Sequence, residues 1–311
     1  MENVIQTENL TKVYSGGVRA LDSLNLGVQP GEIFGYLGPN GAGKTTTIRL
    51  LLDFIRPTAG RARILGMDAR SDSVAIRQRV GYMPGELNLW DKQTAQQIIQ
   101  FVGRARGGYD PRYVRDLGEL LQFDLTKKVR SYSTGNRRKL GLILALMNKP
   151  DLLILDEPST GLDPLMQQTF YQLMQNVRAE GRTVFLSSHI LSEVQAICDR
   201  VGILRGGKLE AVQRVDELTH TDFRHVTLRF REPVGTEIVA GVPGISSVSA
   251  DGKTLHLQLM GDFDPLLRAI SGQYVEDMEV VEPSLEEVFL KYYGATSAVN
   301  NHNHQKVEVK Q

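Results

Sequence analysis

Three short segments of the chain are apolar at nearly every position. They are residues 32–38 (EIFGYLG), 151–156 (DLLILD) and 183–188 (TVFLSS). Unbroken apolar runs of this length are typical of strands buried on both faces of a parallel sheet. Longer segments around them carry apolar residues at three- and four-residue steps, which predicts amphipathic helices. Strands that alternate with helices in this way predict an α/β fold.

The pattern also places the other elements of the first two thirds of the chain. Residues 1–30, 60–68 and 201–212 have the alternation of strands and hairpins, and residues 87–149 are mainly helical. Predicted helices cover residues 44–55, 94–106, 111–123, 132–147, 165–181 and 191–200.

The pattern changes near residue 216. Residues 225–230 (HVTLRF) and 253–260 (KTLHLQLM) alternate apolar and polar positions, as half-buried strands do. A helix at 264–270, a strand at 274–281 and a final helix at 284–293 complete a small α+β domain, which we place at residues 225–293. The polar tail at 295–311 is predicted to be disordered.

Composition narrows the possible functions. The 311 residues suffice for one large domain and one small domain, and 36 basic residues balance 36 acidic ones. This balance argues against a nucleic-acid partner. The first residues lack the pattern of a secretory signal, and no apolar stretch approaches the roughly 20 residues of a membrane span. If the protein works at a membrane, another polypeptide has to supply the spans.

A phosphate-binding motif follows the first apolar strand. The segment GPNGAGKT matches G-x-x-x-x-G-K-[ST] and lies between a predicted strand and a predicted helix, where backbone N–H groups wrap phosphates. Lys44 is expected to reach the terminal phosphates, and the Thr45 hydroxyl is expected to ligate Mg²⁺. The nucleotide-binding residues predicted in this segment are Gly38, Pro39, Asn40, Gly41, Ala42, Gly43, Lys44, Thr45 and Thr46.

Two later strands end in residues that suit the same site. Asp156 ends the strand at 151–156 and is expected to sit beside the Mg²⁺, and Glu157 follows where a carboxylate could polarise an attacking water. His189 ends the strand at 183–188, and a contact with the γ-phosphate is expected of it. The carboxyl ends of strands in an open α/β sheet form the ligand crevice, which favours these roles. The alternatives are a solvated loop glutamate and a structural histidine.

A second helix N-terminus also suits an anion. In YSTGNRRKLGLILALM, which begins at Tyr132, a hydroxyl and a glycine precede an apolar helix. Unpaired N–H groups and the positive end of the helix dipole favour negative charge at such a point. The residues alone do not explain why a chain with one good phosphate loop would need this second site.

The motifs together resemble the ATP-binding subunit of an ABC transporter. In order they are Tyr14, GPNGAGKTT, VGYMPGE, YSTGN, LLILDEPSTGLD and SSH. The resemblance covers about residues 3–218 and implies a P-loop core at 1–218, with a helical subdomain inserted near 87–150.

In that family two subunits sandwich the nucleotide. The resemblance implies that Tyr14 stacks on adenine, that Asp163 connects the two sites, and that the helix after Tyr132 serves the ATP of a partner subunit. The residues of this signature, usually written LSGGQ, are Ser133, Thr134, Gly135 and Asn136.

This chain departs from the family pattern in two places. In the signature, Tyr132, Thr134 and Asn136 replace the usual leucine, glycine and glutamine. The β-branched Thr134 resists backbone conformations that glycine allows. In the coupling loop, Gly85 followed by Glu86 stands where a metal-contacting glutamine is common.

The ending EPSLEEVFLKYYG resembles the extension of bacterial drug-exporter ATPases of the daunorubicin-export type. We therefore predict the ATP- and Mg²⁺-dependent energising subunit of an exporter of drugs or other hydrophobic compounds. It would work at the cytoplasmic face of the membrane with a second ATP-binding subunit, identical or different, and a separate permease contacted by residues 82–90. The alternatives are an importer ATPase whose C-terminal domain is regulatory, and a soluble ABC ATPase with no role in transport.

Overall fold

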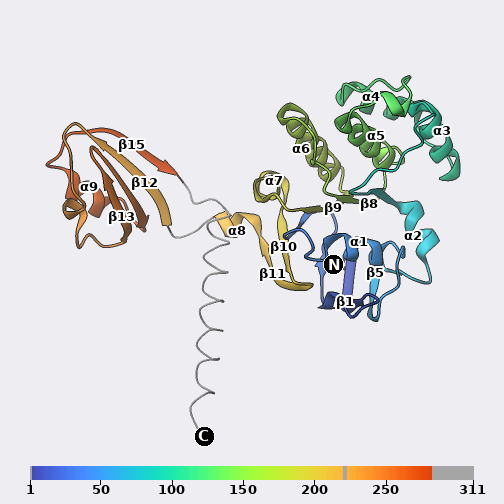
Figure 1. The fold of residues 1–311 in the computed structure, drawn as a ribbon, viewed down its shortest axis with the longest axis horizontal. Coiled ribbons are helices and arrows are strands. Elements are labelled where there is room, and N and C mark those ends of the chain that lie inside the picture. The colour runs from blue at the N-terminus through green and yellow to red at the C-terminus, as the bar shows by residue number, and fades with distance from the viewer. Residues whose placement is uncertain (1, 220–222, 282–311) are drawn as a thin grey trace, which may run out of the picture. The chain divides into compact units, whose positions relative to one another are not determined.

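The computed structural model describes residues 2–219 and 223–281. The chain divides into two compact units, Met1–Val215 and Asp216–Gln311 (Figure 1). The first unit thus ends at Val215, whereas the sequence predicts its end at residue 218. Each unit has its own apolar core, and we describe the two separately.

A six-stranded sheet forms the centre of the first unit. Its order is β11-β10-β4-β9-β8-β7, and only the edge strand β11 runs antiparallel to its neighbour. Every residue of β4, β8 and β9 is buried, as their unbroken apolar runs predict. The strands are β4 (Ile33–Leu37), β7 (Val80–Met83), β8 (Leu152–Asp156), β9 (Thr183–Ser188), β10 (Arg200–Arg205) and β11 (Lys208–Arg214).

A second, antiparallel sheet packs with this one. Its order is β2-β1-β5-β6, and β3 also pairs with β1. One apolar core includes residues from both sheets and from helix α1 (Lys44–Leu51), so α1 is anchored between them. The strands are β1 (Ile5–Val13), β2 (Arg19–Leu24), β3 (Gly27–Val28), β5 (Ala59–Ile64) and β6 (Met67–Asp68).

Several predicted helices end earlier in the structure, and α1 and α7 show why. Helix α1 ends at Leu51 and not at residue 55, because Asp53 takes a left-handed conformation with φ of 58°. Helix α7 ends at Ile197, after which Cys198 is extended and leads into β10. The remaining helices of this core are α2 (Ser73–Arg79), α6 (Pro164–Ala179) and α7 (Leu191–Ile197), and α8 (Val215–Thr219) begins at the boundary between the units.

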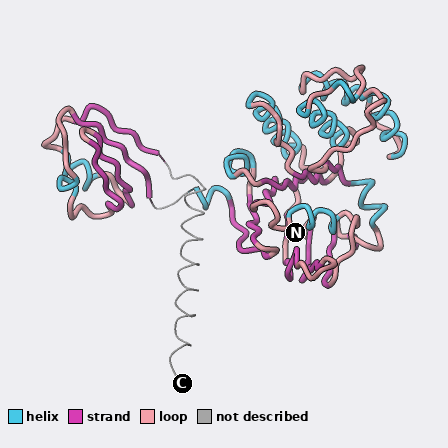
Figure 2. The backbone as a smooth tube through the Cα atoms, viewed as in Figure 1, coloured by secondary structure: helices cyan, strands magenta, loops and turns pink. Residues whose placement is uncertain are grey.

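The helices between β7 and β8 form one group (Figure 2). Helix α5 packs on both α3 and α4, and it also lies against β7, so it joins this group to the central sheet. Caps define where the helices begin: Thr94 forms a capping box with Gln97, and Asp110 accepts from the Arg112 N–H. The elements are α3 (Ala95–Ala105), α4 (Pro111–Leu120), the 3₁₀ turn η1 (Val129–Ser131) and α5 (Thr134–Leu146).

The described part of the second unit is a four-stranded antiparallel sheet with the order β13-β14-β12-β15. Its chain order of strand, short helix, two strands, helix and strand is that of a ferredoxin-like fold, with a 3₁₀ turn as the first helix. The predicted helix at 284–293 and the tail at 295–311 lie outside the described residues. The elements are β12 (Phe223–Phe230), η2 (Thr236–Val239), β13 (Ile245–Asp251), β14 (Thr254–Met260), α9 (Asp264–Ile270) and β15 (Val275–Val281).

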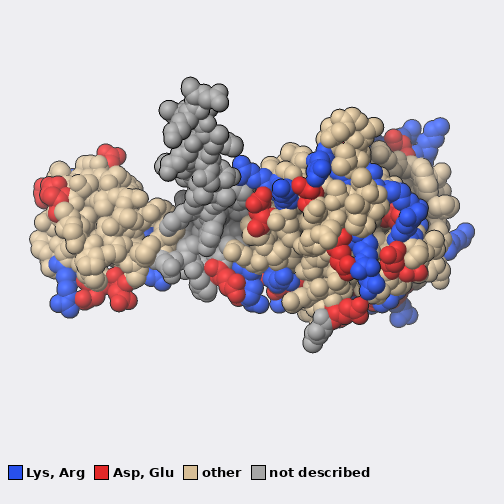
Figure 3. All heavy atoms as spheres, turned by 90° about the horizontal axis from the view of Figure 1, so that it is seen from below, with Lys and Arg blue, Asp and Glu red and all other residues tan. Residues whose placement is uncertain are grey.

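Basic and acidic side chains are interspersed over the first unit on the face in Figure 3. The first unit has exposed ion pairs, such as Arg79 with Asp151 at 2.7 Å and Arg61 with Glu8 at 2.5 Å. None of the helices in residues 2–219 and 223–281 is both long enough and apolar enough to span a membrane.

Candidate functional site

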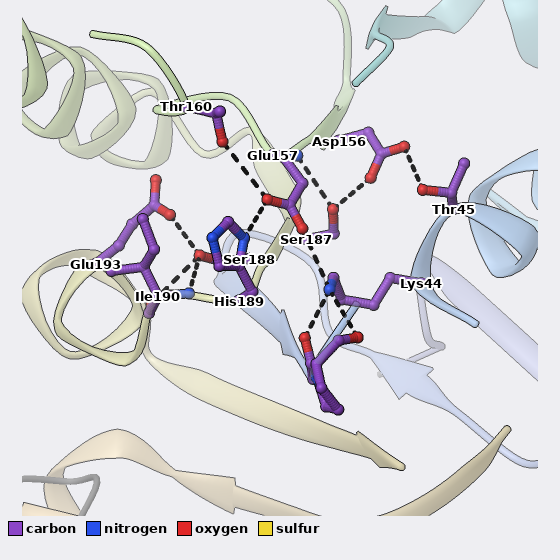
Figure 4. Close-up of polar contacts among 12 residues, drawn as sticks. Lys44, Thr45, Asp156, Glu157, Thr160, Ser187, Ser188, His189, Ile190 and Glu193 are labelled. Carbon is purple, nitrogen blue, oxygen red and sulfur yellow. Dashed lines mark hydrogen bonds and ion pairs between the residues drawn. The ribbon is translucent and has the colours of Figure 1, made fainter. Parts of the chain in front are cut away.

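The candidate site lies where β4, β8 and β9 end (Figure 4). The three strands run parallel in register, with Leu37 beside Ser188 and Asp156 beside Ser187. Their carboxyl ends therefore meet at one edge of the sheet, and the loops that follow them carry the polar side chains. The predicted nucleotide, acid and histidine motifs are brought together at this edge.

The phosphate loop after β4 encloses a cavity of about 170 Å³. Gly43 precedes α1 in a left-handed conformation with φ of 112°, and a Cβ there would lie 2.5 Å from the Ala20 carbonyl oxygen. Only glycine can adopt this backbone conformation and leave room for the Ala20 carbonyl oxygen. The unpaired N–H groups in the first turn of α1 suit an anion. The lining residues are Ala20, Pro39, Asn40, Gly41, Ala42, Gly43, Lys44, Thr45, Thr46 and Glu157.

Lys44 places a positive charge in the wall of this cavity. Its Nζ donates to the carbonyl oxygens of Gly38 at 2.6 Å and Pro39 at 3.3 Å, and it pairs with Glu157 Oε1 at 3.2 Å. Only 6% of the side chain is exposed, so its charge is weakly screened. These contacts hold the ammonium beside the loop that would wrap a phosphate.

Asp156 is held by two hydroxyl groups. Thr45 Oγ1 donates to its Oδ2 at 2.9 Å, and Ser187 Oγ donates to its Oδ1 at 2.5 Å. Thr45, which lines the cavity, thus bonds the buried Asp156 carboxylate, and hydroxyl and carboxylate oxygens are ligand types that Mg²⁺ prefers. A Cβ at Gly85 would lie 3.4 Å from Asp156 Oδ2, so the loop with the unusual glycine approaches this carboxylate closely.

Glu157 lies between a lysine and a histidine. Its Oε1 faces Lys44, its Oε2 contacts His189 Nδ1, and Thr160 Oγ1 donates to Oε2 at 3.5 Å. The backbone of Glu157 is left-handed with φ of 51°, an uncommon and costly conformation for a residue with a side chain. The Glu157 N–H donates to both the carbonyl oxygen and the hydroxyl oxygen of Ser187, at 3.2 and 3.1 Å, and this shared bond helps to hold the conformation.

The predicted signature residues stand apart from this cavity. Ser133 caps helix α5 by accepting from the Asn136 N–H at 3.3 Å, and neither residue lines the cavity. Ser133 and Thr134 are exposed, and a Cβ at Gly135 would lie 3.3 Å from the Gly161 carbonyl oxygen. The start of α5 is thus an exposed helix N-terminus that packs against the loop after Glu157.

The unusual Tyr132 has a structural explanation. Its ring is buried against Phe123, with 4.8 Å between ring centroids, and its hydroxyl donates to the Asp124 carbonyl oxygen at 2.6 Å. Burial raises the pKa of Tyr132 to about 12. The hydroxyl also lies 3.1 Å from the Lys127 carbonyl oxygen, so the tyrosine anchors the start of the signature to the preceding loop by packing and by hydrogen bonding.

Three other predicted residues, Tyr14, Asp163 and Glu86, do not line the cavity. The Tyr14 hydroxyl lies 3.4 Å from Thr46 Oγ1, which places the tyrosine at the end of the phosphate loop. Asp163 caps α6 by accepting from the Met166 N–H at 3.0 Å. Glu86 is exposed.

The sequence prediction missed residues that surround the acids. Ser187 binds both Asp156 and the Glu157 N–H, and Ala20 lines the cavity from β2. Arg138, on α5, donates to the Pro84 carbonyl oxygen at 3.4 Å; burial lowers its pKa, and the nearby Asp156 and Glu157 partly offset this. The pair of serines at the end of a buried strand was the signal that could have identified Ser187, because buried hydroxyls require partners.

Comparison with known proteins identifies the family. The family model described as ABC transporter matches residues 21–160. An uncharacterized ABC transporter ATP-binding protein of Synechocystis is 34% identical over 305 residues, which covers 93% of this chain and 84% of the relative. The bacitracin transport ATP-binding protein BcrA of Bacillus licheniformis is 39% identical over 212 residues, covering 67% of this chain and 69% of BcrA.

The solved structures agree with this result. A structure described as the ATP-binding subunit of an ABC transporter matches with a TM-score of 0.64 and 28% identity, covering 69% of this chain and 91% of that chain. The predicted fold class, a P-loop core of ABC type with an additional C-terminal domain, is confirmed. The chain belongs to the ATP-binding, ATP-hydrolysing subunits of ABC transporters.

Proposed function

We propose that the chain powers export of drugs or other hydrophobic compounds through a separate membrane-spanning partner, at the cytoplasmic face of the membrane. The relative named for bacitracin transport supports a drug-like cargo. The resemblance of the C-terminal extension to drug-exporter ATPases supports export. Co-expression with a candidate permease should lower accumulation of a fluorescent drug in whole cells. Equal accumulation with active and Glu157→Gln chains would refute export by this pair.

Glu157 is the proposed general base for attack of water on the terminal phosphate. The Lys44 Nζ, which would bind the terminal phosphates, lies 3.2 Å from Glu157 Oε1, so this carboxylate is near enough to accept a proton from a water beside them. His189, in contact with Oε2, would orient this carboxylate and reach the γ-phosphate. Glu157→Gln should therefore slow hydrolysis by roughly 10²-fold or more without loss of ATP binding. ATPase turnover within twofold of the unaltered protein would exclude Glu157 as the base.

Lys44 is the proposed anchor of the β- and γ-phosphates. A charge-assisted contact is lost in Lys44→Ala, so ATP binding should fall strongly. Titration calorimetry measures the affinity directly, and unchanged affinity would refute the assignment. Arg79→Ala is a suitable control, because its ion pair with Asp151 is exposed and neither residue lines the cavity.

Mg²⁺ is the proposed cofactor, with Thr45 and Asp156 as the residues that would hold it. When bound with the nucleotide, Mg²⁺ would offset charge on the phosphate oxygens. Ser187 would fix the orientation of the Asp156 carboxylate through the 2.5 Å hydrogen bond. In calorimetry, Asp156→Asn should remove most of the Mg²⁺ dependence of ATP binding.

The separation of Ser133 from the Lys44 cavity is the observation that supports a shared site between two ATP-binding subunits. In this proposal Ser133 and the Gly135 N–H contact the γ-phosphate held by the partner, and Asp163 lies near the connection between the sites. Ser133→Arg and Lys44→Ala would each inactivate a homodimer.

Mixing these two variants tests the shared site. A mixed dimer has one site with both lesions and one with neither, so some ATPase activity should return once native mass spectrometry shows subunit exchange. A photoreactive ATP analogue should then label residue 133 of the Lys44→Ala chain. Labelling confined to the chain that retains Lys44 would refute the shared site.

A further inference from the structure

Behind the His189 loop lies a buried carboxylate, Glu193, that the chemistry above does not use. It occupies the first turn of α7 and is 1% exposed. Burial raises the pKa of this carboxyl, and hydrogen bonding to Ser188 partly offsets the rise. A carboxylate this buried is costly without partners, so its contacts indicate what it does.

The first contact is with Ser188. Ser188 Oγ donates to Glu193 Oε2 at 2.6 Å and accepts from the Ile190 N–H at 2.9 Å. In a capping box, a glutamate in the first turn accepts directly from the backbone N–H of the cap residue. Here the Ser188 hydroxyl lies between the Ile190 N–H and the Glu193 carboxylate. Ser188 and Ile190 are the residues directly before and after His189 (Figure 4).

Ser188 also connects this arrangement to the phosphate loop. Its carbonyl oxygen accepts from the Gly38 N–H at 3.3 Å, and it lies beside Leu37 in the sheet. Glu193 thus fixes the end of β9 at the residue that joins the phosphate loop to the histidine.

The second carboxylate oxygen of Glu193 lacks a comparable bond. Glu193 Oε1 is fully buried and has no hydrogen-bond partner of normal geometry among the described residues. The buried Ser159 hydroxyl is close enough to lower the carboxyl's pKa without forming such a bond with Oε1. Ser159 belongs to the loop that begins at Glu157, the other contact of His189.

We infer that Glu193 is a positioning residue that sets the place of His189 relative to Glu157 and the phosphate loop. It acts through the Ser188 hydroxyl and not by touching the nucleotide. This inference rests on the role proposed above for His189 in hydrolysis.

Substitution of Glu193 should change turnover more than binding. Glu193→Met keeps the size of the side chain but removes the acceptor, so kcat should fall roughly 10- to 100-fold through misplacement of His189. The KM for ATP should stay within about twofold, because the phosphate loop is untouched. Glu193→Gln keeps a carbonyl acceptor for Ser188 and should restore most of kcat, and Ser188→Ala should resemble Glu193→Met.

A matched control comes from Glu32, a second buried carboxylate of the same unit. Glu32 directly precedes β4, at the opposite end of this strand from the phosphate loop. Its Oε1 lies 3.1 Å from Arg200 Nη1. Glu32→Met should lower stability but leave kcat per ATP-binding molecule unchanged, with the binding-competent fraction measured by calorimetry.

A double-mutant cycle with His189→Ala is decisive. If Glu193 acts through His189, Glu193→Met should lower kcat in the unaltered chain and have no further effect in the His189→Ala chain. Equal reductions in both backgrounds, or a Glu193→Gln protein as slow as Glu193→Met, would overturn the positioning role alone. If His189→Ala itself hydrolyses ATP normally, the proposed role of His189 fails, and the inference fails with it.

Discussion

Replacing Gly81 with alanine adds one methyl group to β7 where helix α5 lies against it. The new Cβ would lie 2.1 Å from the Ala145 carbonyl oxygen, 2.7 Å from Pro150 Cγ and 2.8 Å from Leu153 Cδ2. Ordinary contact begins at 3.4 Å, so the backbone of α5 has to move by about 1.3 Å. Overpacking of this kind costs about 1–3 kcal/mol of unfolding free energy. Because α5 also carries Ser133, ATPase activity should fall while ATP affinity is retained.

Urea unfolding measures the expected loss of unfolding free energy directly. The single tryptophan, Trp90, lies in the first unit, so its fluorescence reports that unit. Gly118→Ala, in α4, is the control, because its Cβ meets nothing closer than 3.5 Å and alanine favours a helix by about 1 kcal/mol over glycine. If Gly81→Ala stays within about 0.5 kcal/mol of the unaltered protein and keeps full ATPase activity, the packing argument is wrong.

Three further changes have defined expectations. Ser187→Ala should lower the unfolding free energy by about 1–3 kcal/mol in the same assay, because buried Asp156 loses a hydroxyl donor; a neutral result would contradict that bond. Tyr132→Phe should cost about 0.5–1.5 kcal/mol through loss of the hydrogen bond to Asp124, without a change in kcat beyond about twofold. Removal of residues 220–311 should leave calorimetric ATP affinity unchanged, because the cavity lies in the first unit; loss of binding by a folded truncation would refute this.

The sequence predicted the central sheet well because burial on both faces leaves a strong signal. The runs at 152–155 and 184–186 are apolar throughout, and both strands are parallel and buried in the structure. The phosphate loop was equally predictable, because its glycines, lysine and threonine occupy fixed positions between a strand and a helix.

Helix ends were less predictable, since apolar residues continue past them. Phe54 and Ile55 continue the apolar pattern of α1. The helix nevertheless ends at Leu51, because Asp53 takes a left-handed conformation. Cys198 likewise continues the apolar pattern of α7, but the Asp199 N–H bonds to the Ile33 carbonyl oxygen as the chain approaches β10. In α1 a local left-handed turn ends the helix, whereas in α7 tertiary bonding, which no local pattern contains, decides where the helix stops.

Three of the residues that the sequence did not reveal share one physical property: their polar side chains are buried away from solvent. Ser187, Ser188 and Glu193 are each at most 1% exposed, and each finds its partner in another turn or element. A reactive carboxylate such as Glu157 can be recognised by its motif because the chemistry fixes its place at a strand end. A supporting hydroxyl has no such constraint on its spacing, and only the requirement that buried polar groups be bonded reveals it. At the end of β9 the two kinds of residue are neighbours: Ser187 bonds Asp156 and the Glu157 N–H, Ser188 bonds Glu193, and His189, which contacts Glu157, comes next. If Glu157 and His189 act in hydrolysis as proposed, this strand end sets their geometry, and substitutions behind the site should change kcat before they change ATP affinity.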